Sequence, residues 1–189
     1  SPKKILLIDR DGTINEKAPK GEYITSWDQF KWIPETRNAM SELAGNGFKF
    51  IVITNQAGIA RKMIDPEALE DIHQKMITDL KAFGVEVLKV YMCPDHWDDN
   101  SLMRKPAPGM FFQAAKEFSL RMDHCLYVGD DERDCRAAAN ASCGMVYLTS
   151  YDKSSKLEEF PNPFFISETL QDSVDHIRDT YHCWGEARI

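Results

Sequence analysis

Short apolar segments alternate along the chain with segments of helical length, and this alternation limits the folds that the chain can adopt. The apolar segments are residues 4–8, 48–54, 87–92, 125–129 and 145–149. Helix-type segments lie between them and begin near residues 34, 65, 108 and 130. Parallel strands need long crossovers of this kind, whereas antiparallel strands do not. The order therefore predicts an α/β fold, a three-layer, Rossmann-like parallel sheet with helices on both faces.

The length of 189 residues is typical of one domain. We expect a single domain over residues 1–189, with its core at about residues 4–150. Residues 151–163 are polar and contain prolines, which indicates a connection, and residues 164–166 form an apolar segment typical of a strand. A final helix is expected from about Ser167 to His182. Residues 151–189 are expected to complete the fold, and no function is assigned to them.

Net charge and cysteine content limit the expected binding partners and cellular location of the protein. The net charge of −7 argues against nucleic acid or an anionic membrane as partner, because surplus lysine and arginine normally bind phosphate groups. The five cysteines are scattered and odd in number, which indicates reduced thiols. We see no apolar run near the ~20 residues of a membrane span and no signal peptide. We expect a soluble, cytoplasmic protein; the sequence does not indicate an oligomeric state.

Two aspartates follow the first apolar segment, in the stretch ILLIDRDGT (5–13). Side chains alternate along an extended chain, so Asp9 and Asp11 are expected to point the same way, with Arg10 turned outward between them. Ligands of open parallel sheets bind beyond the carboxyl ends of the strands, where this pair lies. A divalent cation with oxygen ligands, magnesium above all, would relieve the repulsion between the carboxylates. An Asp-Gly turn at Gly12 with an incidental second aspartate is the competing interpretation.

Polar residues also follow three later strands. They are Thr54, Asn55 and Gln56 after the second, Arg104 and Lys105 after the third, and Asp130, Asp131 and Asp134 after the fourth. Hydroxyl, amide and basic groups hold phosphate oxygens, and carboxylates add metal ligands. Each group alone also fits a β-turn, a solvated basic pair or an acidic helix start. Their occurrence together at strand ends indicates a site for a phosphorylated ligand and a metal ion.

Four motifs resemble the signature of the haloacid dehalogenase superfamily of phosphotransferases. They are Asp9-x-Asp11-Gly12-Thr13, then Thr54, then Lys105, then Gly129-Asp130-x-x-x-Asp134. The similarity covers roughly residues 4–150. The segments DRDGTIN, TNQAGIAR and RKPAPGM look like those of the heptose-bisphosphate phosphatases and the related histidinol-phosphate phosphatases. The resemblance implies a magnesium-dependent phosphatase with a haloacid dehalogenase-like fold and a minimal cap.

The resemblance also implies a role for each matching residue. Asp9 would attack phosphorus to form an aspartyl-phosphate, and Asp11 would protonate the leaving alcohol and later deprotonate water. Thr54 and Lys105 would hold the transferring phosphoryl group. Magnesium would be bound by Asp9, the backbone carbonyl of Asp11 and Asp130. The expected supporting residues are Gly12, Thr13 and Asp134. The residues expected to touch the substrate or frame its pocket are Asn55, Gln56, Arg104 and Asp131. Arg61 is expected as a second anion contact, with a surface arginine as the alternative.

The resembled phosphatases carry a zinc loop before the Arg-Lys-Pro motif, and this chain departs from it. Their pattern is Cys-x-His followed by Cys-x-Cys, whereas this chain reads Cys93-Pro94-Asp95-His96 and then Ser101-Leu102-Met103. Four zinc ligands cannot be assembled from these residues. We therefore expect magnesium and no zinc, and a comparatively open pocket whose specificity depends on residues 14–33 and 93–104. The aromatic residues between 23 and 32 are expected to wall this pocket or to pack in the core.

The expected substrate is a small phosphorylated metabolite, in particular a sugar phosphate such as a heptose bisphosphate. Histidinol phosphate is the alternative within the same branch. Polynucleotide 3′-phosphatases share the TNQ and RKP motifs and lack the zinc loop, but the acidic charge and the absence of a basic stripe argue against nucleic acid. A domain that binds phosphorylated ligands without catalysis would usually have lost part of its catalytic set. Asp9, Asp11, Lys105 and Asp130 are all present.

Overall fold

The computed structural model describes residues 3–149 and 164–180. Within them, six strands form one sheet in the order β3-β2-β1-β4-β5-β6, and every neighbouring pair is parallel. The strands are β1 (Ile5–Ile8), β2 (Lys49–Asn55), β3 (Val87–Cys93), β4 (Leu126–Gly129), β5 (Gly144–Leu148) and β6 (Phe164–Ser167). The predicted parallel sheet is confirmed. The connection expected at residues 151–163 lies outside the described residues.

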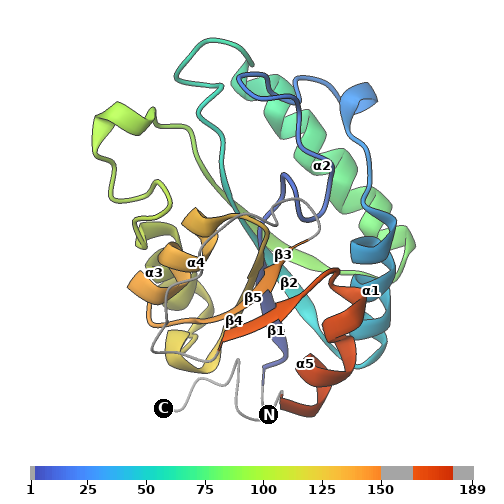
Figure 1. Ribbon diagram of the computed structural model, residues 1–189. Coiled ribbons are helices and arrows are strands. Elements are labelled where there is room, and N and C mark those ends of the chain that lie inside the picture. The colour runs from blue at the N-terminus through green and yellow to red at the C-terminus, as the bar shows by residue number, and fades with distance from the viewer. Residues whose placement is uncertain (1–2, 150–163, 181–189) are drawn as a thin grey trace.

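In this part of the chain, five α-helices cover the two faces of the sheet (Figure 1). One face carries α1 (Pro34–Gly45), α2 (Pro66–Ala82) and α5 (Val174–Thr180), and the other carries α3 (Gly109–Phe118) and α4 (Glu132–Asn140). Short 3-10 turns lie at Trp27–Gln29, Trp97–Asp99, Met122–His124 and Gln171–Ser173. The predicted three-layer architecture is confirmed. No helix among the described residues has the length and apolar character needed to cross a membrane.

Strand side chains alternate between the two faces and build two separate cores. In β1, Leu6 and Ile8 belong to the core under α1, α2 and α5, whereas Ile5 and Leu7 belong to the core under α3 and α4. All four residues of β1 are buried. Burial on both faces explains why the strands are continuous apolar segments in the sequence.

One helix start differs from the sequence expectation. The helix expected near residue 65 is α2, which begins at Pro66 with Asp65 at its N-cap position. The last helix was expected from Ser167 and begins instead at Val174, because β6 continues to Ser167 and a 3-10 turn separates the two elements. Its expected end at His182 lies outside the described residues.

The strand order reverses at β1, which pairs with β2 on one side and with β4 on the other. A crevice forms beyond the carboxyl ends of the strands at such a reversal, because the connections leave in opposite directions. The backbone N–H of Asp9 donates to the carbonyl of Val128 at 2.8 Å. The first residue after β1 therefore stays in register with β4 and next to the residues that follow it.

Phe111 and Phe112 are neighbours on α3 with opposite surroundings. Phe111 is fully buried, and its ring meets the Tyr127 ring edge-on at 4.8 Å, whereas Phe112 is 52% exposed. We predict that Phe111→Ala lowers the free energy of unfolding by about 3–5 kcal/mol, because it leaves a cavity in the core. Phe112→Ala should change it by less than about 1 kcal/mol. Chemical denaturation measures both values, and equal losses would contradict the assignment of the core.

Candidate active site

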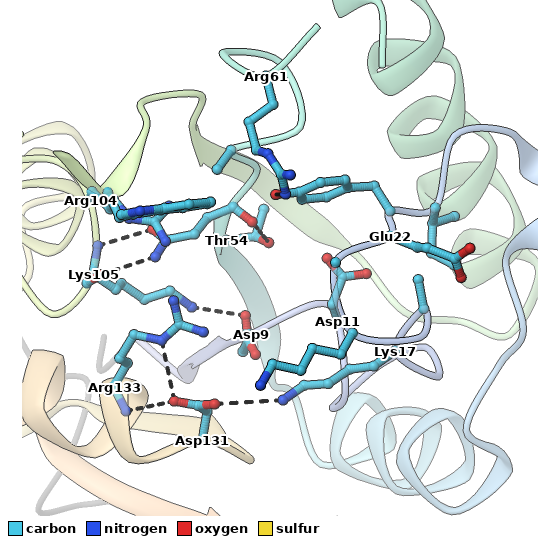
Figure 2. Close-up of a pocket in the computed structure, with 18 of the residues that line it drawn as sticks. Asp9, Asp11, Lys17, Glu22, Thr54, Arg61, Arg104, Lys105, Asp131 and Arg133 are labelled. Carbon is cyan, nitrogen blue, oxygen red and sulfur yellow. Dashed lines mark hydrogen bonds and ion pairs between the residues drawn. The ribbon is translucent and has the colours of Figure 1, made fainter. Parts of the chain in front are cut away.

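The polar residues that follow the strands meet at one edge of the sheet, around a cavity of about 620 Å³ (Figure 2). Asp9 follows β1, Thr54 lies near the end of β2, and Lys105 lies in the loop after β3. The expected site residues that line the cavity are Asp9, Asp11, Thr54, Asn55, Arg61, Arg104, Lys105, Asp131 and Asp134. The other expected residues lie behind its wall: Gly12, Thr13, Gln56 and Asp130.

The Lys105 ammonium is buried between carboxylates. Its Nζ donates to Asp9 Oδ1 at 2.9 Å and to Asp134 Oδ1 at 2.7 Å. It also donates to the Tyr127 hydroxyl at 2.8 Å and to the Ile53 carbonyl at 3.2 Å. Burial alone would lower the pKa of Lys105, but Asp134 and Asp9 outweigh burial and raise it. The side chain therefore stays a cation, fixed by four acceptors.

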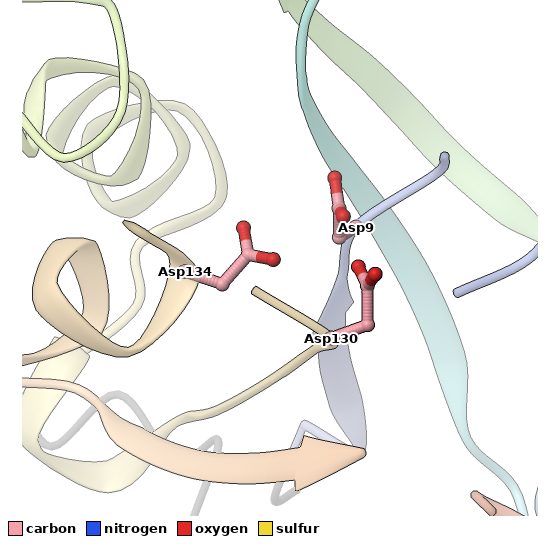
Figure 3. Close-up of side chains that lie close together, drawn as sticks. All are labelled: Asp9, Asp130 and Asp134. Carbon is pink, nitrogen blue, oxygen red and sulfur yellow. The ribbon is translucent and has the colours of Figure 1, made fainter. Parts of the chain in front are cut away.

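Three buried carboxylates converge beside this cation (Figure 3). One oxygen of each of Asp9, Asp130 and Asp134 lies within 4.8 Å of the others. Burial and the Asp134 carboxylate raise the pKa of Asp9 well above its usual value, and they raise that of Asp130 as well. A divalent cation would lower both values, because it stabilises the ionised form. Within residues 3–149 and 164–180, this is the one cluster of acidic, histidine or cysteine groups spaced for a metal ion.

The two oxygens of Asp130 have different surroundings. Oδ1 accepts from the Thr13 hydroxyl at 3.2 Å. Oδ2 is buried and forms an ion pair with the Lys17 ammonium at 2.9 Å. Gly12 makes room for it, because its φ is +84° and a Cβ there would lie 2.2 Å from this oxygen. Buried carboxylate oxygens that lie this close together call for positive charge, so Asp9 and Asp130 fit magnesium.

Asp11 is held by donors on both of its oxygens. Oδ1 accepts from Arg10 Nη2 at 2.7 Å and from Asn15 Nδ2 at 2.9 Å, and Oδ2 accepts from Gln56 Nε2 at 2.8 Å. Burial alone would raise the pKa of Asp11, but the Arg10 charge and these hydrogen bonds outweigh burial and lower it. Asp11 is therefore an ionised carboxylate, the form that takes up a proton. An anionic ester bound in the cavity would raise this pKa.

Arg10 is not turned outward, so that expectation is wrong. Its side chain is fully buried, and Nη1 donates to His73 Nε2 at 2.9 Å. The physical reason is that the alternation of β1 continues past its end. After Leu6 and Ile8, Arg10 faces the side of the sheet that α2 covers, and α2 carries His73. The side chain between the two aspartates thus becomes a buried partner of Asp11.

Gln56 is buried behind the cavity. Its Nε2 donates to Asp11 Oδ2 and, at 3.0 Å, to Thr54 Oγ1, so its amide positions two residues of the site. This arrangement fits a residue that frames the pocket, and a contact with substrate stays a prediction.

Asn55 lines the cavity and also anchors the loop that carries Lys105. Its Nδ2 donates to the Lys105 carbonyl at 3.0 Å, and its Oδ1 accepts from the Lys105 backbone N–H at 3.0 Å. This pair of hydrogen bonds ties the loop after β3 to the end of β2. The position of the Lys105 ammonium therefore depends on Asn55.

Asp131 and Asp134 form the capping box of α4. The Asp131 side chain accepts from the Arg133 backbone N–H at 2.8 Å, and Asp134 Oδ2 accepts from the Asp131 backbone N–H at 3.3 Å. Gly129 allows this turn to close, because a Cβ there would lie 2.6 Å from Asp134. The start of α4 thus places Asp131 on the cavity wall and leaves Asp134 Oδ1 to brace Lys105.

Arginines gather at the mouth of the cavity (Figure 2). Arg61 lies between two rings, 5.6 Å from the centroid of Tyr23 and 5.3 Å from that of Trp97, and donates to the Tyr23 hydroxyl at 3.2 Å. Arg104 is half-buried, and burial together with the charge of Arg133 lowers its pKa. Among the described residues, Arg61 and Arg104 form no ion pair with a carboxylate. Their charges are therefore available to an anionic ligand.

The aromatic residues between 23 and 32 divide between the two expected places. Tyr23 lines the cavity. Trp27 and Phe30 stack at 4.7 Å, and Trp32 meets Phe30 edge-on at 5.0 Å, so these three pack on one another beside the core.

The loop after β3 holds the cysteine and histidine that remain of the zinc pattern. The Cys93 thiol is buried and lies 3.5 Å from Asp95 Oδ2. His96 Nδ1 accepts from the Asp98 backbone N–H at 3.1 Å and caps a 3-10 turn. Both side chains have partners within the loop, and the expectation of no zinc stays a prediction.

Sequence reasoning missed several residues of the site. Two of them could have been found from the sequence. Tyr127 is a polar side chain inside an apolar strand, and Arg133 lies in the first helical turn after Asp130. Lys17 and Trp97 lie in the two segments that were expected to border the pocket, 14–33 and 93–104, but no pattern within these segments singled out either residue.

Fold and site together define a phosphatase of the haloacid dehalogenase superfamily, as the resemblance implied. The sequence model of the family described as polynucleotide kinase 3 phosphatase matches residues 4–155, and the chain belongs to this family.

Named relatives and solved structures agree with this assignment. A D-glycero-beta-D-manno-heptose-1,7-bisphosphate 7-phosphatase of Yersinia pestis is 32% identical over 183 residues, which cover 93% of this chain and 96% of that protein. The histidine biosynthesis bifunctional protein HisB of Campylobacter jejuni is 32% identical over 137 residues, 72% of this chain and 39% of that protein. A crystal structure of D,D-heptose 1,7-bisphosphate phosphatase from Bordetella bronchiseptica, complexed with magnesium and phosphate, has a TM-score of 0.84 and 29% identity, and the match covers 93% of this chain and 98% of that one.

His73 gives the protein a measurable response to acid. Burial and the Arg10 charge lower the pKa of His73 from 6.5 to about 3. Below pH 6.5 the unfolded chain takes up a proton that the folded chain does not, so the stability associated with neutral His73 is lost by about 1.4 kcal/mol per pH unit as the pH falls. We predict that His73→Gln, which keeps an acceptor for Arg10, shows a shallower fall in the free energy of unfolding between about pH 6 and pH 4.

Urea denaturation across this pH range measures the effect. His176→Gln, on the exposed side of α5, is the matched control and should keep the wild-type slope. A His73→Gln protein with the wild-type slope would contradict the buried neutral imidazole.

Proposed function

We propose that this chain is a magnesium-dependent phosphomonoester hydrolase that acts through an aspartyl-phosphate at Asp9, and that its substrate is a small sugar bisphosphate of the heptose type. The observation that carries the proposal is the buried cluster in which Lys105 contacts Asp9 and Asp134 beside the Asp130 carboxylate. The heptose-bisphosphate phosphatases of Yersinia pestis and Bordetella bronchiseptica support the choice of substrate.

In the first step, an Asp9 oxygen attacks phosphorus and the bond from phosphorus to the ester oxygen breaks. Lys105 fixes Asp9 Oδ1 and places a cation beside the phosphoryl oxygens, and the Thr54 hydroxyl on the cavity wall donates to one of them. Asp11, protonated once the anionic ester has raised its pKa, transfers that proton to the departing alcohol oxygen.

In the second step, water attacks phosphorus and the bond to the Asp9 oxygen breaks, which releases phosphate and restores the Asp9 carboxylate. Asp11 takes the proton of this water and so regains the proton that it lost in the first step. Arg10, Asn15 and Gln56 donate to its oxygens and stabilise the carboxylate form from which it acts as a base.

The metal site supports the same reaction. Asp9, the backbone carbonyl of Asp11 and Asp130 would hold magnesium. When bound, the ion would supply positive charge that reduces the repulsion between the Asp9 carboxylate and an anionic phosphoryl group. The raised pKa values of Asp9 and Asp130, caused by burial and by Asp134, are the reason that these residues need such a charge to act as carboxylates.

The arginines at the cavity mouth favour a substrate with a second anionic group. Arg61 is held between Tyr23 and Trp97, and neither it nor Arg104 is paired with a carboxylate in the described part of the chain. Guanidinium groups bind phosphate through two parallel hydrogen bonds. A bisphosphate would place one phosphoryl group at Asp9 and the other at this mouth.

A 3′-phosphorylated polynucleotide is the second candidate. The description of the matching family favours it, and so does Trp97, which is 51% exposed at the cavity and offers a ring on which a base can stack. Histidinol phosphate remains the alternative metabolite.

We predict that a heptose 1,7-bisphosphate gives the highest kcat/KM in a panel with histidinol phosphate, p-nitrophenyl phosphate and a 3′-phosphorylated oligonucleotide, all assayed with magnesium. Two phosphoryl groups engage both the buried site and the arginines, whereas the other metabolites engage the buried site alone. Phosphate release measures each rate. Faster, salt-sensitive cleavage of the oligonucleotide would contradict a metabolite as the substrate.

Arg61→Met tests the second anion contact. We predict that it lowers kcat/KM for the bisphosphate about 10- to 100-fold, as expected for the loss of a charged hydrogen bond, and leaves p-nitrophenyl phosphate hydrolysis within about threefold of wild type. Arg121→Met, which removes an exposed arginine paired with Asp123, is the control and should change neither. Equal losses with both substrates would contradict the assignment.

A further inference from the structure

The Lys17 ammonium forms an ion pair with one oxygen of Asp130, a proposed magnesium ligand. Asp130 Oδ1 accepts from the Thr13 hydroxyl, and Oδ2 is the oxygen that Lys17 contacts. Lys17 Nζ lies 2.9 Å from this Oδ2. Magnesium binds carboxylate oxygens at about 2.0–2.1 Å. The ammonium and the ion would therefore compete for the same carboxylate oxygen.

The loop after β1 is built to bring Lys17 to this position. The Gly12 backbone N–H donates to the Asn15 carbonyl at 2.7 Å, and the Glu16 N–H donates to the Lys31 carbonyl at 2.8 Å, so the backbone on the N-terminal side of Lys17 is fixed. Gly12 also lets the side chain pass, because a Cβ there would lie 2.5 Å from Lys17 Cε.

We propose that Lys17 is an internal competitor for the divalent cation, which pairs with Asp130 in the metal-free protein and leaves Asp130 Oδ2 when the ion binds. The inference rests on the proposed function, because that function assigns the ion to Asp9 and Asp130. Two positive charges cannot share one carboxylate oxygen without strong repulsion. The ion therefore binds with an affinity that Lys17 has reduced.

Asp131 is the acceptor to which the displaced side chain moves. Its Oδ2 lies 3.6 Å from Lys17 Nζ, and Figure 2 shows the two side chains joined on the cavity wall. The Lys17 side chain is 42% exposed, so it has room to shift. When the ion binds, the Lys17 ammonium leaves Asp130 and pairs with Asp131 on the cavity wall. Its positive charge is then available to an anionic substrate, so binding of the metal ion and binding of the substrate are coupled.

Lys17→Met removes the charge and nearly keeps the length of the side chain. Isothermal titration calorimetry with MgCl₂ should give an about tenfold tighter Kd for Lys17→Met than for wild type. Lys20→Met is the matched control, since Lys20 lines the same cavity and has no ion pair among the described residues; its Kd should stay within about twofold. A second readout is thermal unfolding: adding MgCl₂ should raise the Tm of Lys17→Met more than that of wild type.

The magnesium-binding measurements decide whether Lys17 competes with the ion. An unchanged or weaker Kd in Lys17→Met would overturn the competitor role, and so would an equal tightening in Lys20→Met, which would mean a general charge effect. Asp130→Asn separates the two proposals. If wild type binds magnesium and Asp130→Asn does not, the metal site stands whatever Lys17 does. If neither protein binds the ion, both the metal site and the competitor role are overturned.

Discussion

The double contact of the Lys105 ammonium with Asp9 and Asp134 is the interaction on which the rest of the site depends. Buried carboxylates repel one another, and removing the Lys105 cation between Asp9 and Asp134 would leave both carboxylates without this compensation. Three features of the fold make this contact possible. Asn55 ties the Lys105 backbone to the end of β2, Gly129 lets Asp134 approach, and the parallel order of the sheet brings all of them to one edge.

Strand alternation divides the chemistry of the site between two sides of the sheet. Asp9 continues the row of Leu7 and meets Lys105, whereas Arg10 continues the row of Ile8 and meets His73. The buried carboxylate cluster therefore raises the pKa of Asp9, which needs added positive charge to ionise. Arg10 and the other hydrogen-bond donors lower the pKa of Asp11 and keep it ionised. The pKa values of two acids only two residues apart are therefore shifted in opposite directions. In the proposed reaction a metal ion would have to lower the pKa of Asp9, and an anionic substrate would have to raise that of Asp11.

The sheet and the positions of Asp9, Lys105 and Asp130 were predictable, because apolar segments mark the strands and ligand residues follow their carboxyl ends. The burial of Arg10 was not, since it depends on α2, which begins more than fifty residues later. The hydrogen bonds of Gln56 were not predictable either, because only the packed structure shows that its amide donates to Asp11 and Thr54. Lys17 lies in a loop without periodicity, and no local pattern connects it with Asp130.

The most direct test of the proposed reaction is to find which residue carries the phosphoryl group during turnover. The enzyme would be acid-quenched while it hydrolyses p-nitrophenyl phosphate with magnesium, and its peptides analysed by mass spectrometry. We predict one phosphoryl group on the peptide that contains Asp9, and neither this label nor turnover in Asp9→Asn. A phosphoryl group on another residue, or turnover by Asp9→Asn at the wild-type rate, would contradict the mechanism.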